Sequence, residues 1–499
     1  MDYLIRFVQA HESFRRPELE ALARLANVEI RIIYYSTTSP FCIVRFKGTG
    51  SRNLEVIARH FISNSILAKA IYELWGSGND YEALHADIAT RSKQLWPSYK
   101  SRTFKFTIDG YLGKRSSSEQ RELINSFAYL SFQGDITMIS PYATFTIFED
   151  WETPDALHPD LAAETGKPRQ VKQLYFGRLT GESSRDLILK HDLKKRPYIS
   201  TTSMDAELAL LTATLALASP GKLFFDPFVG TGGFMVAAAE LEAMTLGSDI
   251  DGRSFRGKGR GLEKGVGANF AKYELEDYFG DCIISDLTNT PLRANTPTMS
   301  TRWLDGIICD PPYGVREGLK VLGTRAAPAG KEFFHDTARM TLDADGAYLI
   351  DGTPAHLLPS YIPPKRPYSF MRMLDDILAF AACTLIDDGR LAFWMPVANE
   401  GMEHDFPIPQ NRSLELVHCC VQPFNRWSRR LLVYRRRKVR EVDEMMGDDL
   451  EGKEGLTAEW ELLVDRSSAD DLNPFRKRYF QGFENRGQDN KNDENLFKS

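Results

Sequence analysis

The sequence lacks long hydrophobic runs and paired cysteines, and both absences narrow the classes of protein to which it can belong. No apolar stretch in the 499 residues approaches the roughly 18 that a membrane span needs. The N-terminus has no basic segment followed by a long apolar one, which argues against a secretion signal. The six cysteines are scattered and form no Cys-x-x-Cys pair. We therefore expect buried thiols in a reducing compartment and no intrinsic metal site.

An excess of positive charge is also lacking, because 68 Asp and Glu outnumber 62 Lys and Arg and give a net charge of −6. This deficit argues mildly against binding to nucleic acid, which rests on positive contacts to phosphate. The total conceals an arginine-rich stretch at residues 426–440, followed directly by an acidic one at 441–451. The basic stretch has two interpretations, a solvated charged face or a surface that contacts nucleic acid.

The length exceeds what one hydrophobic core supports, and the pattern along the chain predicts several parts. Residues 1–65 mix short β-like runs with a helix, which predicts a small α+β domain. Residues 66–180 repeat this mixture and begin with an expected helix at 66–75. Residues 190–440 predict a separate α/β domain. Residues 441–499 form a polar tail whose end, rich in Asn, Asp and Lys, is expected to be disordered.

Strands and helices alternate within residues 190–440, and this alternation predicts a mostly parallel sheet. Candidate strands lie at 222–225, 244–248, 283–285, 304–309 and 390–395, and a helix at 370–385 precedes the last of them. Two further extended runs, 414–421 and 430–434, have no room for a helix between them. They predict a terminal antiparallel hairpin on the parallel sheet.

A glycine-rich turn, Asp-Pro-Phe-Val-Gly-Thr-Gly-Gly at residues 226–233, follows the first of these strands and precedes an expected helix at 234–242. Glycine lets a ligand approach the backbone closely, and a helix start offers free N–H groups. A dinucleotide-binding fold would place a pyrophosphate there. Asp226, however, repels phosphate and attracts an ammonium group. The turn therefore favours a nucleoside that carries an amino acid, such as S-adenosyl-L-methionine.

Acidic residues end two further strands of the series. Asp249 and Asp251 follow the strand at 244–248 and are suited to accept hydrogen bonds from ribose hydroxyls. Asp286 ends the next strand and is suited to accept one from the adenine amine. Ligands bind at the carboxyl ends of parallel strands, so acids at three such ends predict one pocket. The alternative is that they are turn aspartates that stabilise helix starts.

The most informative motif is Asp310-Pro311-Pro312-Tyr313, which follows the apolar strand at 304–309. Two consecutive prolines continue neither a helix nor a sheet, so the chain leaves the strand with a rigid backbone. Asp310 and the Pro311 carbonyl can accept hydrogen bonds from an exocyclic amine, and Asp310 can take its proton afterwards. Tyr313 can stack on the base, which is worth about 1–3 kcal/mol. The motif predicts transfer of a group onto a planar nitrogen, with positioning supplying most of the rate.

Residues 196–437 resemble the class I methyltransferases that modify exocyclic amines, and more closely the eukaryotic tRNA guanosine N2-methyltransferases that act on guanosine 10. The matching segments are 198–205 (Tyr-Ile-Ser-Thr-Thr-Ser-Met-Asp), 226–233, 249–251, 268–270 (Ala-Asn-Phe) and 310–317 (Asp-Pro-Pro-Tyr-Gly-Val-Arg-Glu). The front half resembles the N-terminal domain and the THUMP RNA-binding domain of the same family, through 14–18, 71–76 and 175–178.

The resemblance implies a Rossmann-like class I methyltransferase domain behind an N-terminal α+β RNA-binding region with a THUMP domain. It implies methyl transfer from S-adenosyl-L-methionine to the exocyclic N2 of a guanosine, guanosine 10, in tRNA. It also implies a heterodimer with a small zinc-containing activator subunit and a cytoplasmic setting. The predicted catalytic residues are Asp310, Pro311, Pro312 and Tyr313. The predicted cofactor-binding residues are Asp226, Phe228, Gly230, Thr231, Gly232, Asp249, Asp251 and Asp286, and the predicted substrate-binding residues are Ser203 and Arg316.

Two other functions remain open at this point. A DNA or protein (glutamine) amino-methyltransferase shares Asp-Pro-Pro-Tyr, although the α+β front half argues against it. A non-catalytic RNA-binding subunit would be favoured by a degraded glycine turn or by loss of Asp310, and the sequence has neither change.

Overall fold

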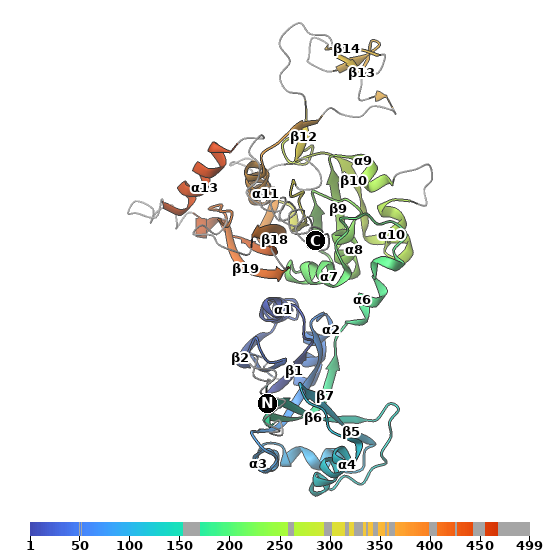
Figure 1. Ribbon diagram of the computed structural model, residues 1–499, viewed down its shortest axis with the longest axis vertical. Helices are drawn as coiled ribbons and strands as arrows, with labels where there is room; N and C mark the ends of the chain where they lie inside the picture. The colour runs from blue at the N-terminus through green and yellow to red at the C-terminus, as the bar shows by residue number, and fades with distance from the viewer. Residues whose placement is uncertain are drawn as a thin grey trace, which may run out of the picture. The chain divides into compact units, whose positions relative to one another are not determined.

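The structure is a computed structural model of the chain and is drawn in Figure 1. It describes residues 1–48, 50, 52–152, 170–257, 264–293, 302–314, 319–323, 333–335, 338–342, 348–354, 357–358, 365–398, 407–424, 427–442 and 455–467. The chain divides into two compact units, Met1–His191 and Asp192–Ser499, here called the N-terminal and C-terminal units. Each unit has its own seven-stranded sheet.

The N-terminal unit is built on a mixed sheet with the strand order β2-β3-β1-β4-β7-β6-β5. Neighbouring strands are antiparallel, except for the parallel pair β5 and β6. The strands are β1 (Tyr3–Phe7), β2 (Glu29–Tyr35), β3 (Phe41–Lys47), β4 (Ala68–Gly78), β5 (Phe104–Tyr111), β6 (Ala143–Trp151) and β7 (Val171–Glu182). The helices are α1 (Glu12–Leu25), α2 (Leu54–Ser63), α3 (Tyr81–Arg91), α4 (Ser117–Ser126) and α6 (Asp186–Lys190), with 3-10 turns η1 (Lys93–Tyr99) and η2 (Ala128–Leu130).

Strands from both of the expected N-terminal domains, 1–65 and 66–180, pair within this one sheet. The junction is the antiparallel pair of β1 with β4, in which Ile5 lies opposite Ile71. The unit is therefore α+β, as expected, and its division at about residue 65 stays a prediction.

The helix predicted at residues 66–75 is wrong, because this segment forms the central strand β4 between β1 and β7. Two irregularities interrupt the pairing of β4 with β7, between Ile71 and Tyr72 and between Leu74 and Gly76. Each irregularity shifts which side chains face the core, so the apolar residues do not alternate with the period of two that marks a regular strand. The resulting spacing resembles that of a helix.

The C-terminal unit is built on a sheet with the strand order β10-β9-β8-β11-β18-β20-β19. The first five strands in this order are parallel, and β20 is antiparallel to both β18 and β19. The strands are β8 (Leu223–Asp226), β9 (Met244–Asp249), β10 (Phe279–Ile284), β11 (Leu304–Cys309), β18 (Leu385–Ala398), β19 (Leu414–Pro423) and β20 (Trp427–Arg436). The predicted α/β fold, a mostly parallel sheet finished by an antiparallel hairpin, is confirmed.

The helices of the C-terminal unit are α7 (Ala206–Leu215), α8 (Gly233–Glu240), α9 (Gly252–Arg256), α10 (Val266–Tyr273), α11 (Phe370–Thr384) and α13 (Gly455–Arg466), with 3-10 turns η3 (Leu193–Lys195) and η4 (Glu276–Tyr278). A two-stranded sheet pairs β12 (Lys320–Leu322) with β17 (Lys365–Pro367). A four-stranded sheet contains β13 (Phe333–His335), β14 (Ala338–Leu342), β15 (Tyr348–Ile350) and β16 (Thr353–Pro354).

The main core of the C-terminal unit lies between the sheet and α11. The buried residues of this core include Leu374, Ile377 and Leu378 of α11 together with Phe393 of β18 and Tyr434 of β20. The Phe393 and Tyr434 rings stack with centroids 5.9 Å apart. Burial of these apolar side chains supplies the main driving force for the packing of α11 on the sheet.

The opposite face of the sheet is covered in part by α7. Trp394 of β18, next to Phe393 and therefore on the other face, donates a hydrogen bond from Nε1 to Thr212 Oγ1 of α7 at 3.1 Å. Every residue of α7 except Glu207 is buried, which explains why its sequence is apolar all round. The sheet is thus sandwiched between helices, as in other α/β folds.

Part of the expected polar tail is ordered as α13. Trp460 of this helix is buried and donates a hydrogen bond to Asp375 Oδ1 of α11 at 3.0 Å. The disorder predicted for the end of the tail concerns positions outside the described residues. Within the described part of the chain, no helix combines the length and the apolar character needed to cross a membrane.

Candidate active site

The turn between β8 and α8 carries five of the predicted site residues, which are Asp226, Phe228, Gly230, Thr231 and Gly232. The backbone is left-handed at Gly230 (φ 51°) and at Gly232 (φ 75°), a conformation that strains residues with side chains. A Cβ atom at Gly232 would also lie 2.6 Å from Val266 Cγ1. Glycine is therefore required there by backbone conformation and by close packing.

Asp226, at the end of β8, is 1% exposed and keeps one oxygen unused. Its Oδ1 accepts a hydrogen bond from Phe228 N at 2.9 Å, whereas Oδ2 has no hydrogen-bond partner among the described residues. Burial raises the pKa of Asp226 well above its ordinary value, and the charges of Asp249 and Asp310 raise it further. A cation placed beside such a buried carboxylate would stabilise its ionised form.

Asp249, at the end of β9, fixes the shape of the glycine turn. Its Oδ2 accepts a hydrogen bond from Gly230 N at 3.0 Å, and its Oδ1 accepts one from Asp251 N at 2.8 Å. Burial raises the pKa of Asp249, although these backbone bonds act against the shift. The side chain thus ties the ends of two neighbouring strands together.

Asp251 sits among cations, and its pKa is shifted in the opposite direction to that of Asp249. Arg253 donates hydrogen bonds from Nε to Oδ1 at 2.9 Å and from Nη2 to Oδ2 at 2.6 Å. Lys365 Nζ lies 3.5 Å from Oδ2. The hydrogen bond from Arg253 holds the pKa of Asp251 below its ordinary value, so this carboxylate stays ionised.

Ser203 lies beside the glycine turn, since its Oγ is 2.8 Å from Thr231 Oγ1. The segment that carries Ser203 is anchored by Asn269, a fully buried residue of α10. Asn269 accepts a hydrogen bond from Tyr198 N and donates to the carbonyl oxygens of Tyr198 and Thr231, each at 2.9 Å. Sequence reasoning did not select Asn269 as a site residue, although it lies in one of the matching segments.

Asp286 follows β10 and joins this strand to β12. Its Oδ1 accepts hydrogen bonds from Thr288 N at 2.8 Å, Thr288 Oγ1 at 2.7 Å and Asn289 N at 2.9 Å. Its Oδ2 accepts one from Leu322 N of β12. This carboxylate therefore orders a turn and holds β12 near the end of β10.

Asp310 follows β11, and two side chains contact its carboxylate. The Tyr313 hydroxyl donates a hydrogen bond to Asp310 Oδ1, and Arg429 Nη1 lies 3.9 Å from Asp310 Oδ2. Burial raises the pKa of Asp310 to about 6, while Tyr313 and Arg429 act in the opposite direction. Burial and the charge of Asp310 also raise the pKa of Tyr313, which therefore keeps its proton. Pro311 is buried and Pro312 is exposed.

Arg429 of β20 is a site residue that sequence reasoning did not select. The arginine-rich run at 426–440 was visible, but nothing in it distinguishes Arg429 from its neighbours. The pairing of β20 with β18, which brings this side chain to the end of β11, depends on the register of the sheet.

The structure brings the predicted acids together at one edge of the sheet. Strands β9, β8 and β11 are adjacent and parallel, so Asp249, Asp226 and Asp310 end neighbouring strands. The effect of Asp249 and Asp310 on the pKa of Asp226 reflects this proximity. Asp286 lies one strand further along, after β10. Arg316, predicted to bind substrate, lies outside the described residues.

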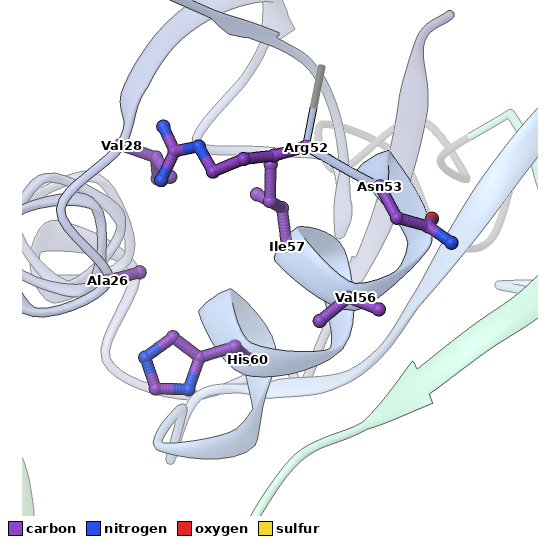
Figure 2. Close-up of a pocket in the computed structure, with 7 residues that line it drawn as sticks. All are labelled: Ala26, Val28, Arg52, Asn53, Val56, Ile57 and His60. Carbon is purple, nitrogen blue, oxygen red and sulfur yellow. The ribbon is translucent and has the colours of Figure 1, made fainter. Parts of the chain in front are cut away.

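A separate pocket of about 360 Å³ occurs in the N-terminal unit (Figure 2). Figure 2 shows side chains of α2, among them Val56 and His60, on one side and Ala26 and Val28 on the other. None of the predicted site residues lines it. The candidate active site is therefore defined by the strand ends of the C-terminal unit.

Known proteins are similar to this chain over most of its length. Residues 1–185 match the family described as the Tmrp11 THUMP N-terminal domain. The chain is 42% identical to the tRNA (guanine(10)-N(2))-methyltransferase of Saccharomyces cerevisiae over 435 residues, which cover 87% of this chain and 92% of that one. It is 35% identical to the protein of that name from Schizosaccharomyces pombe over 470 residues, with 87% and 89% covered.

The human tRNA (guanine(10)-N(2))-methyltransferase is 30% identical to the chain over 444 residues, which cover 86% of this chain and 87% of that one. Among solved structures, TrmN from Thermus thermophilus is 15% identical to this chain, and the alignment covers 87% of this chain and 100% of TrmN. The TM-score is 0.38, a structural similarity too low to carry an argument. The similarity to the three relatives extends over both units. The chain therefore belongs to the tRNA (guanine(10)-N(2))-methyltransferase family.

Proposed function

We propose that this chain transfers the methyl group of S-adenosyl-L-methionine to the exocyclic N2 of guanosine 10 in tRNA. Family membership supports this reaction, because the relatives carry its name. The observation that supports it most within the chain is the proximity of Asp226, Asp249 and Asp310 at the ends of adjacent strands. This proximity supports one shared site for the predicted cofactor-binding residues Asp226 and Asp249 and the predicted catalytic residue Asp310.

The described residues fit S-adenosyl-L-methionine, which when bound supplies a methyl group on a positively charged sulfur. The unused Oδ2 of Asp226 suits the ammonium group of the cofactor, and the positive end of the helix dipole of α8 suits its carboxylate. Phe228, Gly230, Thr231 and Gly232 belong to the same turn.

The nucleoside part of the cofactor has three candidate acceptors. Each oxygen of Asp249 accepts one backbone N–H, and a carboxylate oxygen has two lone pairs. Asp249 can therefore also accept from a ribose hydroxyl, and Asp251 can do the same beside Arg253. Asp286 is the proposed acceptor for the adenine amine.

Asp310 and the Pro311 carbonyl are the proposed acceptors for the two N–H groups of the guanine amine. These bonds hold the amine in place and direct its lone pair toward the cofactor side of the site. As N2 gains the methyl group it also gains positive charge, which Asp310 stabilises before it takes the proton. Tyr313 orients Asp310 through its hydroxyl and offers its ring to the base.

The N-terminal unit is the proposed tRNA-binding part, divided as the sequence predicts into an α+β domain (1–65) and a THUMP-like domain (66–180). Ser203 and Arg316 are proposed to contact the substrate near the methyltransferase domain (190–440). We also propose a heterodimer with a small zinc-containing activator subunit and a cytoplasmic setting. Both of these proposals rest on the family resemblance.

The test is mapping of the modified nucleoside by mass spectrometry. The chain, co-expressed with the activator subunit, is incubated with S-adenosyl-L-methionine and an unmodified tRNA transcript, with a transcript that carries adenosine at position 10 as control. We expect N2-methylguanosine at position 10 of the first transcript and none in the control. Methylation of DNA or of a glutamine-containing peptide instead, or no transfer to any of them, would overturn the proposal.

A further inference from the structure

Arg429 faces the candidate active site from the antiparallel end of the sheet. It lies directly opposite Gln422 of β19 and Pro396 of β18 in the strand pairing. Residues two apart on a strand share a face, so Trp394 lies on the same face as these three, and Phe424, which directly follows β19, brings its ring against the Arg429 guanidinium. The hairpin therefore gathers an arginine, an amide and two aromatic rings on the α7 side of the sheet.

The guanidinium of Arg429 is hydrogen-bonded along one edge and contacts two aromatic rings. Gln422 Oε1 accepts hydrogen bonds from Arg429 Nε at 3.0 Å and from Nη2 at 2.7 Å. The Arg429 Cζ atom lies 5.1 Å from the centroid of Trp394 and 5.5 Å from that of Phe424. Trp394 is itself fixed by its hydrogen bond to Thr212. Such contacts restrict the guanidinium to one orientation.

The remaining nitrogen, Nη1, is the one that lies 3.9 Å from Asp310 Oδ2. We propose that Arg429, clamped by Gln422, is a positioning residue that holds the Asp310 carboxylate in the orientation in which it accepts hydrogen bonds from the base. The inference rests on the proposed function and extends it, because it assigns to the terminal hairpin a part in the acceptor site.

The charged and titratable groups that face Asp310 are few, so the contribution of Arg429 can be measured. Among the residues that the structure describes, they are Tyr313 and Cys309 on its own segment, Asp226 at the end of β8 and Arg429 on β20. Arg429 is the one cation among them, and Asp310 is largely buried. Removing this cation should raise the pKa of Asp310 further, so that the carboxylate loses its acceptor role at neutral pH.

The experiment compares Arg429→Gln with Arg429→Lys and with Arg430→Gln. The first variant removes the charge, and the second keeps a charge without the fork that binds Gln422. The third removes a charge from the adjacent residue of β20, which faces the other side of the sheet. The thermal unfolding temperature and the cofactor affinity are measured for each, to separate loss of folding from loss of positioning.

The first readout is the pH profile of kcat for tRNA methylation. For Arg429→Gln we expect a loss of about tenfold near pH 6.5 that shrinks to about twofold near pH 8.5, because higher pH restores the carboxylate. Arg429→Lys should keep the shape of the parent's pH profile with a lower kcat at every pH, because the charge stays and the clamp by Gln422 is lost, and Arg430→Gln should match the parent. A loss for Arg429→Gln that is equal at all pH values, or no loss, would overturn the inference.

The second readout does not depend on the substrate. Aspartate labelled with carbon-13 in the side-chain carboxyl allows Asp310 to be titrated by nuclear magnetic resonance, with its signal assigned from its loss in Asp310→Asn. The midpoint should be higher in Arg429→Gln than in the parent and unchanged in Arg430→Gln. An unchanged midpoint in Arg429→Gln contradicts the inference even if no methylation of tRNA is seen, whereas inactivity of the parent chain contradicts only the proposed function.

Discussion

Two aspartates of the candidate active site differ in pKa because their surroundings differ. Asp251 is paired with Arg253, which lowers its pKa, whereas burial raises the pKa of Asp310 to about 6. Asp251 is thus ionised at neutral and mildly acidic pH. Asp310 changes its charge in a range that an assay can cover. The two carboxylates are suited to different tasks, a permanent acceptor and a proton acceptor.

The pH dependence of the reaction should report the ionisation of Asp310. A protonated Asp310 cannot accept both a hydrogen bond and a proton from the amine, so kcat should fall below about pH 6, by about tenfold per pH unit.

Asp310→Ala should reduce transfer at least about a thousandfold at every pH while leaving the dissociation constant of the cofactor nearly unchanged. Pre-steady-state kinetics with labelled cofactor and calorimetric titration measure the two effects. Activity that survives in Asp310→Ala would remove the role given to this residue.

Asp249 should act on cofactor binding instead. Asp249→Ala leaves the N–H groups of Gly230 and Asp251 without their acceptor and loosens the turn. We expect the dissociation constant for S-adenosyl-L-methionine to rise about tenfold or more, which is roughly 1.4 kcal/mol. Isothermal titration calorimetry tests this, with Asp281→Ala on β10 as the control variant. A constant equal to that of the parent would exclude Asp249 from the pocket.

The positions of the acids could be predicted at this scale, but the position of Arg429 could not. Asp226, Asp249 and Asp286 each follow an apolar run in the sequence, and the ends of parallel strands gather at one edge. Arg429 reaches Asp310 only through the register that sets it opposite Gln422 and Pro396. Register depends on pairing between distant segments, which the local pattern of one strand does not reveal.

Among the elements of the N-terminal unit, α1 is joined to the start of β4 by one buried carboxylate. Glu18 of α1 is fully buried, and its oxygens accept hydrogen bonds from Ser65 Oγ at 2.8 Å, Ile66 N at 2.6 Å and Leu67 N at 3.1 Å. Burial nevertheless raises the pKa of Glu18 to about 7, because the bonds compensate only in part for the lost hydration.

This junction predicts a pH-dependent stability for the N-terminal unit. Because the pKa of Glu18 is higher in the folded state than in the unfolded chain, its contribution to stability is greatest below about pH 4.5 and falls as the pH rises to about 7. Glu18→Gln should abolish this dependence, and Glu18→Ala should cost roughly 3 kcal/mol by leaving backbone N–H groups unpaired. Hydrogen exchange of the amides of β4 in the full chain, at pH 5 and pH 8, measures both. An equal pH dependence in Glu18→Gln would refute the assignment.

At the scale of elements, the parallel strands and the terminal hairpin could be predicted, whereas β4 could not. The run at 304–309 is apolar apart from Asp305 and Gly306, and the run at 390–395 is apolar after Arg390, as expected of strands buried on both faces. In β4, the irregularities beside Tyr72 and Gly76 break the alternation that marks a strand. The identity of β4 depends on its pairing with β1 and β7, and neither partner is adjacent in the sequence.

At the scale of the whole molecule, the two units should be separable in function. A chain reduced to residues 192–499 keeps every described site residue, from Ser203 to Arg429, so its affinity for the cofactor should change by no more than about twofold. Its affinity for tRNA should fall about tenfold or more, because the proposed RNA-binding unit is missing. Calorimetry and electrophoretic mobility shift measure these, with residues 1–191 alone as the complementary fragment. Equal binding of tRNA by the shortened chain would contradict the assignment of the N-terminal unit.

The order in which the catalytic sheet is synthesised has a consequence for the cell. β19 and β20 are the last two strands of that sheet in the chain, and β20 carries the guanidinium that reaches Asp310. We therefore expect a nascent polypeptide on the ribosome to lack methyl-transfer activity until translation has passed Arg436. A product of premature termination before Leu414 would expose the unpaired edge of β18, which marks it for aggregation or degradation, and would release no stray modifying activity.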